Sequence, residues 1–248
     1  MHRQKPPLAF EDKEFLTSRE ARTIRILSEY IDPETKFKKH GIKNTVVFFG
    51  SARIHPGKET KMSKYYWAAE EFAFALANYS KELRKEGNDF FICTGGGPGI
   101  MEAANRGARR ADEKTIGLNI SLPFEQHPNE YISDELNFEF HYFYMRKLWF
   151  LYQAKALIVF PGGFGTMDEL FETLTLIQTQ KIEKGNIPVL LYDKAWWERL
   201  YNFQQLVDDE LISAQDLNLF KFFNSTEEGL EILKPKIKDL IIHVKETV

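Results

Sequence analysis

Short, almost wholly apolar runs alternate with longer segments of helical spacing from about residue 44 onward. Such runs predict buried strands, and they occupy residues 45–49, 89–93, 115–122, 156–160 and 188–192, with a further candidate at 138–141. The predicted helices between them cover residues 62–86, 100–111, 143–154 and 166–181. This alternation predicts an α/β fold: a doubly wound, mostly parallel Rossmann-like sheet with helices on both faces.

The chain length is that of one domain of this class. Its 248 residues predict a single Rossmann-like domain over residues 1–248. Residues 1–43 are polar and predict a helical N-terminal extension, because residues 14–30 place apolar side chains at helical spacing. Residues 44–192 form the predicted nucleotide-binding core, and residues 193–248 a C-terminal helical part.

The composition narrows the possible partners and compartment. The chain has 33 Lys and Arg against 36 Asp and Glu, a net charge of −3, without a basic block, so we expect no nucleic-acid partner. Its single cysteine, Cys93, cannot form an intrachain disulfide, which favours a reducing compartment. No signal peptide can be read, and no apolar run approaches the ~18 residues of a membrane span. We therefore expect a cytoplasmic protein without a membrane partner.

Two glycine-rich loops occupy equivalent places in the predicted fold, at residues 94–102 and 160–169. Each follows an apolar strand and opens a helix, where backbone N–H groups and the helix dipole favour an anion. Ligands of open α/β sheets bind at this carboxyl edge. We interpret both loops as anion-binding; the alternative is two tight strand-to-helix turns.

Known phosphate motifs narrow the choice of anion. The dinucleotide pattern G-x-G-x-x-G fails because Ile100 occupies its third glycine position, and neither loop contains Gly-Lys-Ser/Thr. A mononucleotide or a sugar phosphate therefore fits better than NAD or ATP. Ser51 and Arg53 follow the first strand, so they either contact the ligand or only form a turn. The six histidines lack metal-binding spacing, and we expect no metal and no cofactor.

Charged residues stand in unusual places beside these loops. If Thr166 caps its helix, Glu169 completes a capping box; the alternative is that Glu169 faces a bound sugar. Asp168 lies about 100° away around the helix and is expected to be solvated or to pair with the helix dipole. Arg146 and Lys147 lie near a helix start, where cations oppose the helix dipole. They are either a surface pair or cations held for a ligand phosphate or for Glu169.

The chain resembles the LOG ("lonely guy") family of phosphoribohydrolases. Residues 161–169 match its P-G-G-x-G-T-x-x-E signature, and residues 145–147 and 95–97 match its M-R-K and glycine blocks in the expected order. The resemblance covers roughly residues 44–192. Residues 1–43, the Ser51-Ala52-Arg53 turn and Glu102 depart from the short plant-type pattern and fit the longer bacterial branch.

The resemblance implies hydrolysis of a nucleoside 5′-monophosphate, AMP or a cytokinin riboside 5′-monophosphate, to free base and ribose 5-phosphate by a homodimer or higher homo-oligomer. It implies that Arg146 and Glu169 are the catalytic pair. Members are often described as lysine decarboxylases, but no lysine site for pyridoxal phosphate can be read here. The implied substrate contacts are Gly95, Gly96, Gly97, Met101, Met145, Lys147, Pro161, Gly162, Gly163, Gly165 and Thr166. We also expect Glu102, which departs from the family pattern, to line the ribose or base side of the site.

This resemblance suggests a mechanism to test. Glu169 would face the ribose, stabilise the cation that develops when the glycosidic bond breaks, and orient or deprotonate water. Arg146 would hold Glu169 ionised and in place. The alternative function is a non-catalytic carrier or sensor that binds a nucleotide or a phosphorylated cofactor in the same place.

Overall fold

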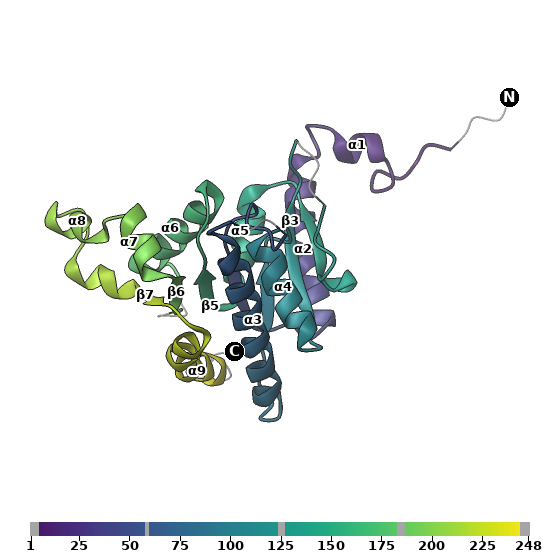
Figure 1. Cartoon of the computed structure of the whole chain (residues 1–248). Helices are drawn as coiled ribbons and strands as arrows, with labels where there is room; N and C mark the ends of the chain where they lie inside the picture. The colour runs from purple at the N-terminus through teal and green to yellow at the C-terminus, as the bar shows by residue number, and fades with distance from the viewer. Residues whose placement is uncertain (1–4, 58–59, 124–126, 183–186, 244–248) are drawn as a thin grey trace.

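A computed structural model describes residues 5–57, 60–123, 127–182 and 187–243. These residues form a seven-stranded sheet, every strand of which pairs in parallel with its neighbours (Figure 1). The order across the sheet is β4-β3-β2-β1-β5-β6-β7, which confirms the predicted doubly wound fold. The strands are β1 (Thr45–Phe49), β2 (Phe91–Thr94), β3 (Thr115–Ile120), β4 (Asn137–Phe140), β5 (Ala154–Val159), β6 (Val189–Tyr192) and β7 (Phe220–Phe223).

Helices cover both faces of this sheet, and each face has its own apolar core. One core packs the sheet against α3 (Ser63–Arg84), α4 (Ile100–Arg110) and α9 (Thr226–His243). The other packs it against α2 (Arg22–Lys39), α5 (Phe143–Tyr152) and α6 (Phe164–Gln178). The remaining elements are α1 (Lys13–Thr17), α7 (Lys194–Leu200), α8 (Phe203–Asp208) and the 3₁₀ helices η1 (Asp134–Leu136) and η2 (Ala214–Leu219). None of the helices in the described ranges is long and apolar enough to cross a bilayer.

The chain reverses its direction of winding beside β1. That strand pairs with β2 on one side and with β5 on the other. Such a switch point separates the loops that leave the carboxyl ends of neighbouring strands and creates a place for a ligand. Both glycine loops lie there, one after β2 and one after β5, together with the Ser51 turn after β1.

The N-terminal extension differs from the single helix expected over residues 14–30. It forms a short α1, which projects away from the body of the molecule (Figure 1), and a long α2 that continues to Lys39. Pro33 lies inside α2 and has no N–H to donate to the carbonyl of Glu29. The indole N–H of Trp149 on α5 donates to that carbonyl instead, over 3.0 Å. A neighbouring helix thus satisfies the group that the proline leaves free.

The C-terminal part contains a strand that the helical prediction missed. Strand β7 joins the sheet at the edge beside β6. Its four residues, Phe220–Phe223, alternate only partly between buried and exposed positions. So short an edge strand carries little periodic signal, which explains the wrong prediction for this segment.

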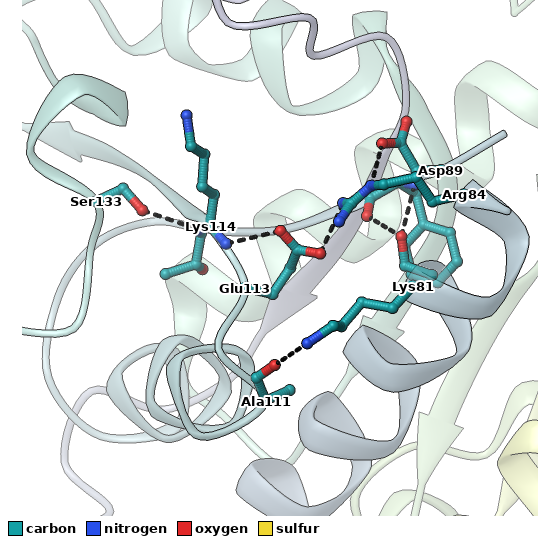
Figure 2. A network of polar contacts seen from close by, with 10 residues as sticks. Lys81, Arg84, Asp89, Ala111, Glu113, Lys114 and Ser133 are labelled. Carbon is teal, nitrogen blue, oxygen red and sulfur yellow. Dashed lines mark hydrogen bonds and ion pairs between the residues drawn. The ribbon is translucent and has the colours of Figure 1, made fainter. Parts of the chain in front are cut away.

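A polar network lies at the amino-terminal ends of β2 and β3 (Figure 2). Arg84 at the end of α3 forms ion pairs with Asp89 at 2.9 Å and with Glu113 at 2.6 Å. Lys81 donates to the carbonyl of Ala111 over 3.0 Å. These contacts tie α3 to the start of β2 and to the loop between α4 and β3, on the side of the sheet away from the glycine loops.

Candidate active site

Ser51 connects the two glycine loops. Its backbone N–H donates to the carbonyl of Pro161 over 3.1 Å, and its carbonyl accepts from the N–H of Ile100 over 3.1 Å. Its hydroxyl accepts from the N–H of Arg53, whose side chain is exposed. The turn after β1 therefore holds the loops after β5 and β2 together at the switch point.

The loop after β2 needs glycine at two positions. Gly96 and Gly99 have positive φ angles of 73° and 74°, a region that other residues enter at a cost. A Cβ atom on Gly99 would lie 2.3 Å from the carbonyl oxygen of Ser51, and one on Gly96 would lie 2.0 Å from Oδ1 of Asn119. The two glycines let the loop adopt its shape and pack closely against β1 and β3.

The side-chain amides of buried Asn105 and partly buried Asn129 position this loop, and the sequence did not single them out. Asn129 donates from Nδ2 to the carbonyls of Gly96 and Gly97 and to Oδ1 of Asn105. Thr94, which is fully buried, donates to the same Oδ1 and accepts from the N–H of Gly96. Asn129 lies in an irregular segment after β3, so no periodic or motif signal marks it.

The second loop opens α6 without a side-chain cap. The N-cap residue is Gly163, so Thr166 does not cap the helix and the capping-box alternative for Thr166 and Glu169 is excluded. Thr166 is instead buried in the first turn, beneath Gly162, where an added Cβ would lie 2.1 Å from its Oγ1. In the described part of the chain, the N–H groups of residues 164–166 donate no hydrogen bond. The helix start therefore presents unpaired donors.

The predicted catalytic pair does come together. Nη2 of Arg146 on α5 lies 3.8 Å from Oε1 of Glu169 on α6, and the two side chains are 14% and 8% exposed. This is an ion pair at longer than hydrogen-bond distance. Arg146 also approaches the first glycine loop: a Cβ on Gly95 would lie 3.8 Å from its Nη1. The pair thus lies between the two helices, beside the loop after β2.

Lys147 faces three carboxylates of α6. Its ammonium lies 2.6 Å from Glu172, 2.8 Å from Asp168 and 3.7 Å from Glu169. Asp168 is exposed, as expected, but this ion pair holds it. Of the two open possibilities for residues 146 and 147, the structure therefore shows cations held beside Glu169 and not a solvated surface pair.

Burial determines the direction of the pKa shifts of Glu169 and Arg146. Burial raises the pKa of Glu169 to about 7, against the opposing effects of Lys147 and then Arg146. Burial also lowers the pKa of Arg146, although Glu169 opposes this. Arg146 favours the ionised form of Glu169 as expected, but burial outweighs it. A carboxyl group that titrates near neutrality can exchange a proton at physiological pH.

The other predicted contacts lie around this centre in different surroundings. Met101 is adjacent to Gly95, where an added Cβ would lie 2.9 Å from its sulfur. Glu102 accepts from the hydroxyl of Tyr66 on α3 over 2.7 Å. Met145 is buried in the core beneath α5. Within the described ranges, no group of His, Cys, Asp or Glu is arranged to hold a metal ion.

Glu29 is a further residue that the sequence did not reveal. Its carboxylate accepts from the N–H groups of His141 and Tyr142, over 2.8 and 3.2 Å. Those groups immediately precede α5, the helix of Arg146 and Lys147. The N-cap Tyr142 makes no side-chain cap of its own. A carboxylate from α2 therefore caps this helix and orients it.

Solved structures share this fold at low sequence identity. The X-ray structure of TM1055 superposes with a TM-score of 0.55 at 22% identity, over 77% of this chain and 99% of that one. A molybdenum cofactor binding protein from the phototrophic bacterium Rippkaea orientalis gives 0.52 at 21% identity, over 79% of this chain and 98% of that one. These similarities extend to the fold only.

Comparison of the sequence with known proteins identifies the family of this chain. It is 32% identical over 111 residues to the pyrimidine/purine nucleotide 5′-monophosphate nucleosidase of Escherichia coli K12, which covers 40% of this chain and 23% of that protein. The matched stretch thus spans only about a quarter of the relative's length. A family model described as "possible lysine decarboxylase" matches residues 101–233, more than half of the chain. The chain therefore belongs to this family, the LOG family.

Proposed function

We propose that the protein hydrolyses the N-glycosidic bond of a nucleoside 5′-monophosphate, such as AMP or a cytokinin riboside 5′-monophosphate, to free base and ribose 5-phosphate. The observation that carries this proposal is the buried pair of Arg146 and Glu169 beside two glycine loops. Family membership and the partial similarity to a nucleotide nucleosidase support the same class of reaction.

Glu169 supplies the chemistry in this proposal. Breaking the bond between C1′ and the base leaves positive charge on the ribose, which a carboxylate stabilises. Glu169 then accepts a proton from water as the water oxygen bonds to C1′ and the bond from C1′ to the base breaks. The departing base takes up a proton from solvent, and Glu169 afterwards returns its proton to solvent, which restores the carboxylate. Its pKa of about 7 suits a group that must accept and release protons near neutral pH.

The start of α6 binds the 5′-phosphate in this proposal. The unpaired N–H groups of residues 164–166 and the dipole of a 15-residue helix favour an anion there. A Cβ on Gly163 or Gly165 would meet no atom within 4 Å, so a phosphate can approach the backbone closely. The Thr166 hydroxyl adds a further hydrogen bond. Phosphate binding then helps to hold C1′ near Glu169.

Arg146 is the second catalytic residue proposed. Its Nε is buried and makes no hydrogen bond to the described residues. A buried donor without a partner is costly, and a ligand oxygen would satisfy it. Arg146 is therefore placed to contact the substrate as well as Glu169. The loop after β2, with Met101 and Glu102, lines the ribose or base side, and Ser51 and Arg53 complete the site from β1.

The test is direct. The protein is incubated separately with AMP, GMP, CMP and UMP, and chromatography measures free base and ribose 5-phosphate. We expect release of base from at least one nucleotide, and the rates rank the bases. The Glu169→Gln variant, shown to be folded by circular dichroism, should release almost none. Equal release by wild type and variant would contradict the role of Glu169.

A carrier or sensor of a phosphorylated ligand is the second candidate. It is favoured by the fold shared with a protein described as binding molybdenum cofactor. The same assay separates the two functions, because a carrier binds nucleotide, detected by calorimetry, without releasing base. Dependence of turnover on Glu169 would reject the carrier.

We also propose that the protein works as a homodimer or higher homo-oligomer. Helices α3 and α5 expose large apolar side chains: Trp67 is 48%, Phe143 49% and Tyr144 47% exposed. Contacts between copies at either helix would remove these side chains from water. Light scattering of the purified protein tests this; a monomer at all concentrations would contradict it.

A further inference from the structure

The two adjacent cations of α5 have different surroundings. Arg146 lies beside the glycine loop and contacts the rings of Phe143 and Phe150, at 5.2 and 5.4 Å from the ring centres. The cationic group of Lys147 instead contacts carboxylates of α6, two of them at hydrogen-bond distance. Arg146 is thus the member of this pair that is seen to approach the loop after β2.

The carboxylates around Lys147 hold its ammonium. Asp168 and Glu172 lie on either side of Glu169 along α6, and their contacts with Lys147 are 2.8 and 2.6 Å, against 3.7 Å for Glu169. The Lys147 side chain is only 15% exposed. A doubly charged phosphate would meet the repulsion of these carboxylates. The surroundings therefore suit a cation that holds Glu169 better than one that binds a phosphate.

We propose that Lys147 is a positioning residue for Glu169: anchored by Asp168 and Glu172, its ammonium fixes the Glu169 carboxylate and favours its ionised form. This inference rests on the proposed function, in which Glu169 acts as the base. It assigns Lys147 a role different from the substrate contact that the family resemblance implies. It also gives Asp168 and Glu172 a part in the site, as the groups that orient Lys147.

The pKa of Glu169 depends on the charged groups that face it. Arg146 and Lys147 approach it from α5, and Asp168 and Glu172 from its own helix; Glu139 of β4 acts on Arg146. Burial raises the pKa of Glu169 to about 7, and Lys147 opposes this more than Arg146 does. A nearby opposite charge shifts a carboxyl pKa by about 1–3. Loss of Lys147 should therefore leave Glu169 largely protonated at pH 7.

The first experiment measures Glu169 directly. Glutamate is labelled with ¹³C at the side-chain carboxyl, the Glu169 resonance is assigned by its absence in Glu169→Gln, and its titration is followed by NMR. In Lys147→Met we expect the midpoint to rise by about one pH unit; Lys147→Arg should restore it toward wild type. If Lys147→Met does not fold, Lys147→Gln replaces it. Lys238→Met, which removes a remote lysine paired with Glu86, controls for the loss of one charge.

The second experiment measures turnover across pH with the best nucleotide. In Lys147→Met we expect the acid limb of kcat/KM to move to higher pH together with the Glu169 titration. At pH values below the midpoint, kcat/KM should fall about tenfold. Inhibition by ribose 5-phosphate should be unchanged. An unmoved Glu169 titration, or weaker binding of ribose 5-phosphate without a shift of the acid limb, would overturn the inference. If the titration moves but wild type releases no base from any nucleotide, the positioning of Glu169 stands and only the proposed function fails.

Discussion

Arg146 and Glu169 approach to 3.8 Å from two different helices, and neither side chain is more than 14% exposed. The carboxyl group of Glu169 still has a raised pKa of about 7, because burial outweighs the two cations beside it. The site therefore holds a group that is half ionised at neutral pH, in a place where a charge is costly. That combination makes activity and stability depend on pH in opposite ways.

Replacement of the Glu169 carboxylate tests whether this group is needed for turnover. Glu169→Gln keeps the size of the side chain but cannot accept a proton. We expect turnover to fall by about 10²–10⁴-fold, the usual contribution of a general base, without loss of the folded state. Glu198→Gln, on the exposed surface of α7, is the matched control and should keep wild-type rates of base release.

The stability of the wild-type protein should fall as pH rises, whereas its activity should increase. The pKa of Glu169 is about 7 in the folded protein and about 4.3 when unfolded, so the folded state binds the extra proton between these values. Wild-type stability from this group is therefore present at low pH and is lost as pH rises from about 4.5 to 7. Glutamine does not titrate, so the Glu169→Gln variant does not lose this stability as pH rises. Urea titrations should show the variant gaining on wild type by roughly 2–3 kcal/mol between pH 4.5 and pH 8; a constant difference would contradict the raised pKa.

Two neighbouring glycines offer a probe of the phosphate site. A Cβ on Gly163 meets no atom within 4 Å, whereas one on Gly162 would lie 2.1 Å from Thr166 Oγ1. Gly163→Ala should therefore fold normally and raise KM, since the methyl group occupies the space of the phosphate. Gly162→Ala should lower the melting temperature because Thr166 must move. Unchanged KM in Gly163→Ala would place the phosphate elsewhere.

The ion pairs of Arg84 at the amino-terminal ends of the strands should affect stability but not turnover. Glu113 is 7% exposed and pairs with Arg84 (Figure 2). In Glu113→Gln the buried partner loses its charge. We expect a loss of about 1–2 kcal/mol in free energy of unfolding, because Arg84 is partly exposed and remains hydrated. Base release at 25 °C should be unchanged; a large drop would connect this edge to the site.

The cap that α2 supplies to α5 should matter for turnover. Glu29→Ala removes the acceptor for the N–H groups of His141 and Tyr142. We expect a loss of about 0.5–2 kcal/mol of stability and a lower kcat with little change in KM, because Arg146 and Lys147 follow on the same helix. Glu34→Ala, which removes a surface pair with Lys38 on α2, is the control.

The sequence predicted the sheet well because its central strands are buried on both faces. Strands β1 and β5 are buried at every position, and the continuous apolar runs at residues 46–49 and 156–159 are typical of strands covered on both faces. The edge strand β7 is short and half exposed, so its pattern is weak. The extension was predicted as one helix, but the cost of Pro33 in α2 is offset by Trp149, a contact between residues far apart in the sequence.

The site could be predicted where a family motif marks its residues, namely the glycine loops, Arg146 and Glu169. The contacts of Lys147 with Asp168 and Glu172 could not be, because helical spacing puts these two carboxylates near Glu169 but does not say which cation of another helix reaches them. Asn129 lies in an irregular segment, and its three amide contacts arise only when the chain folds.

The double attachment of Ser51 has a mechanical consequence. Its N–H is bound to the loop after β5 and its carbonyl to the helix that follows the loop after β2, so neither loop can shift far without pulling on the other. A ligand that draws in the loop after β5 should therefore also move the loop after β2. The connection consists of main-chain atoms, which substitution of the Ser51 side chain leaves in place.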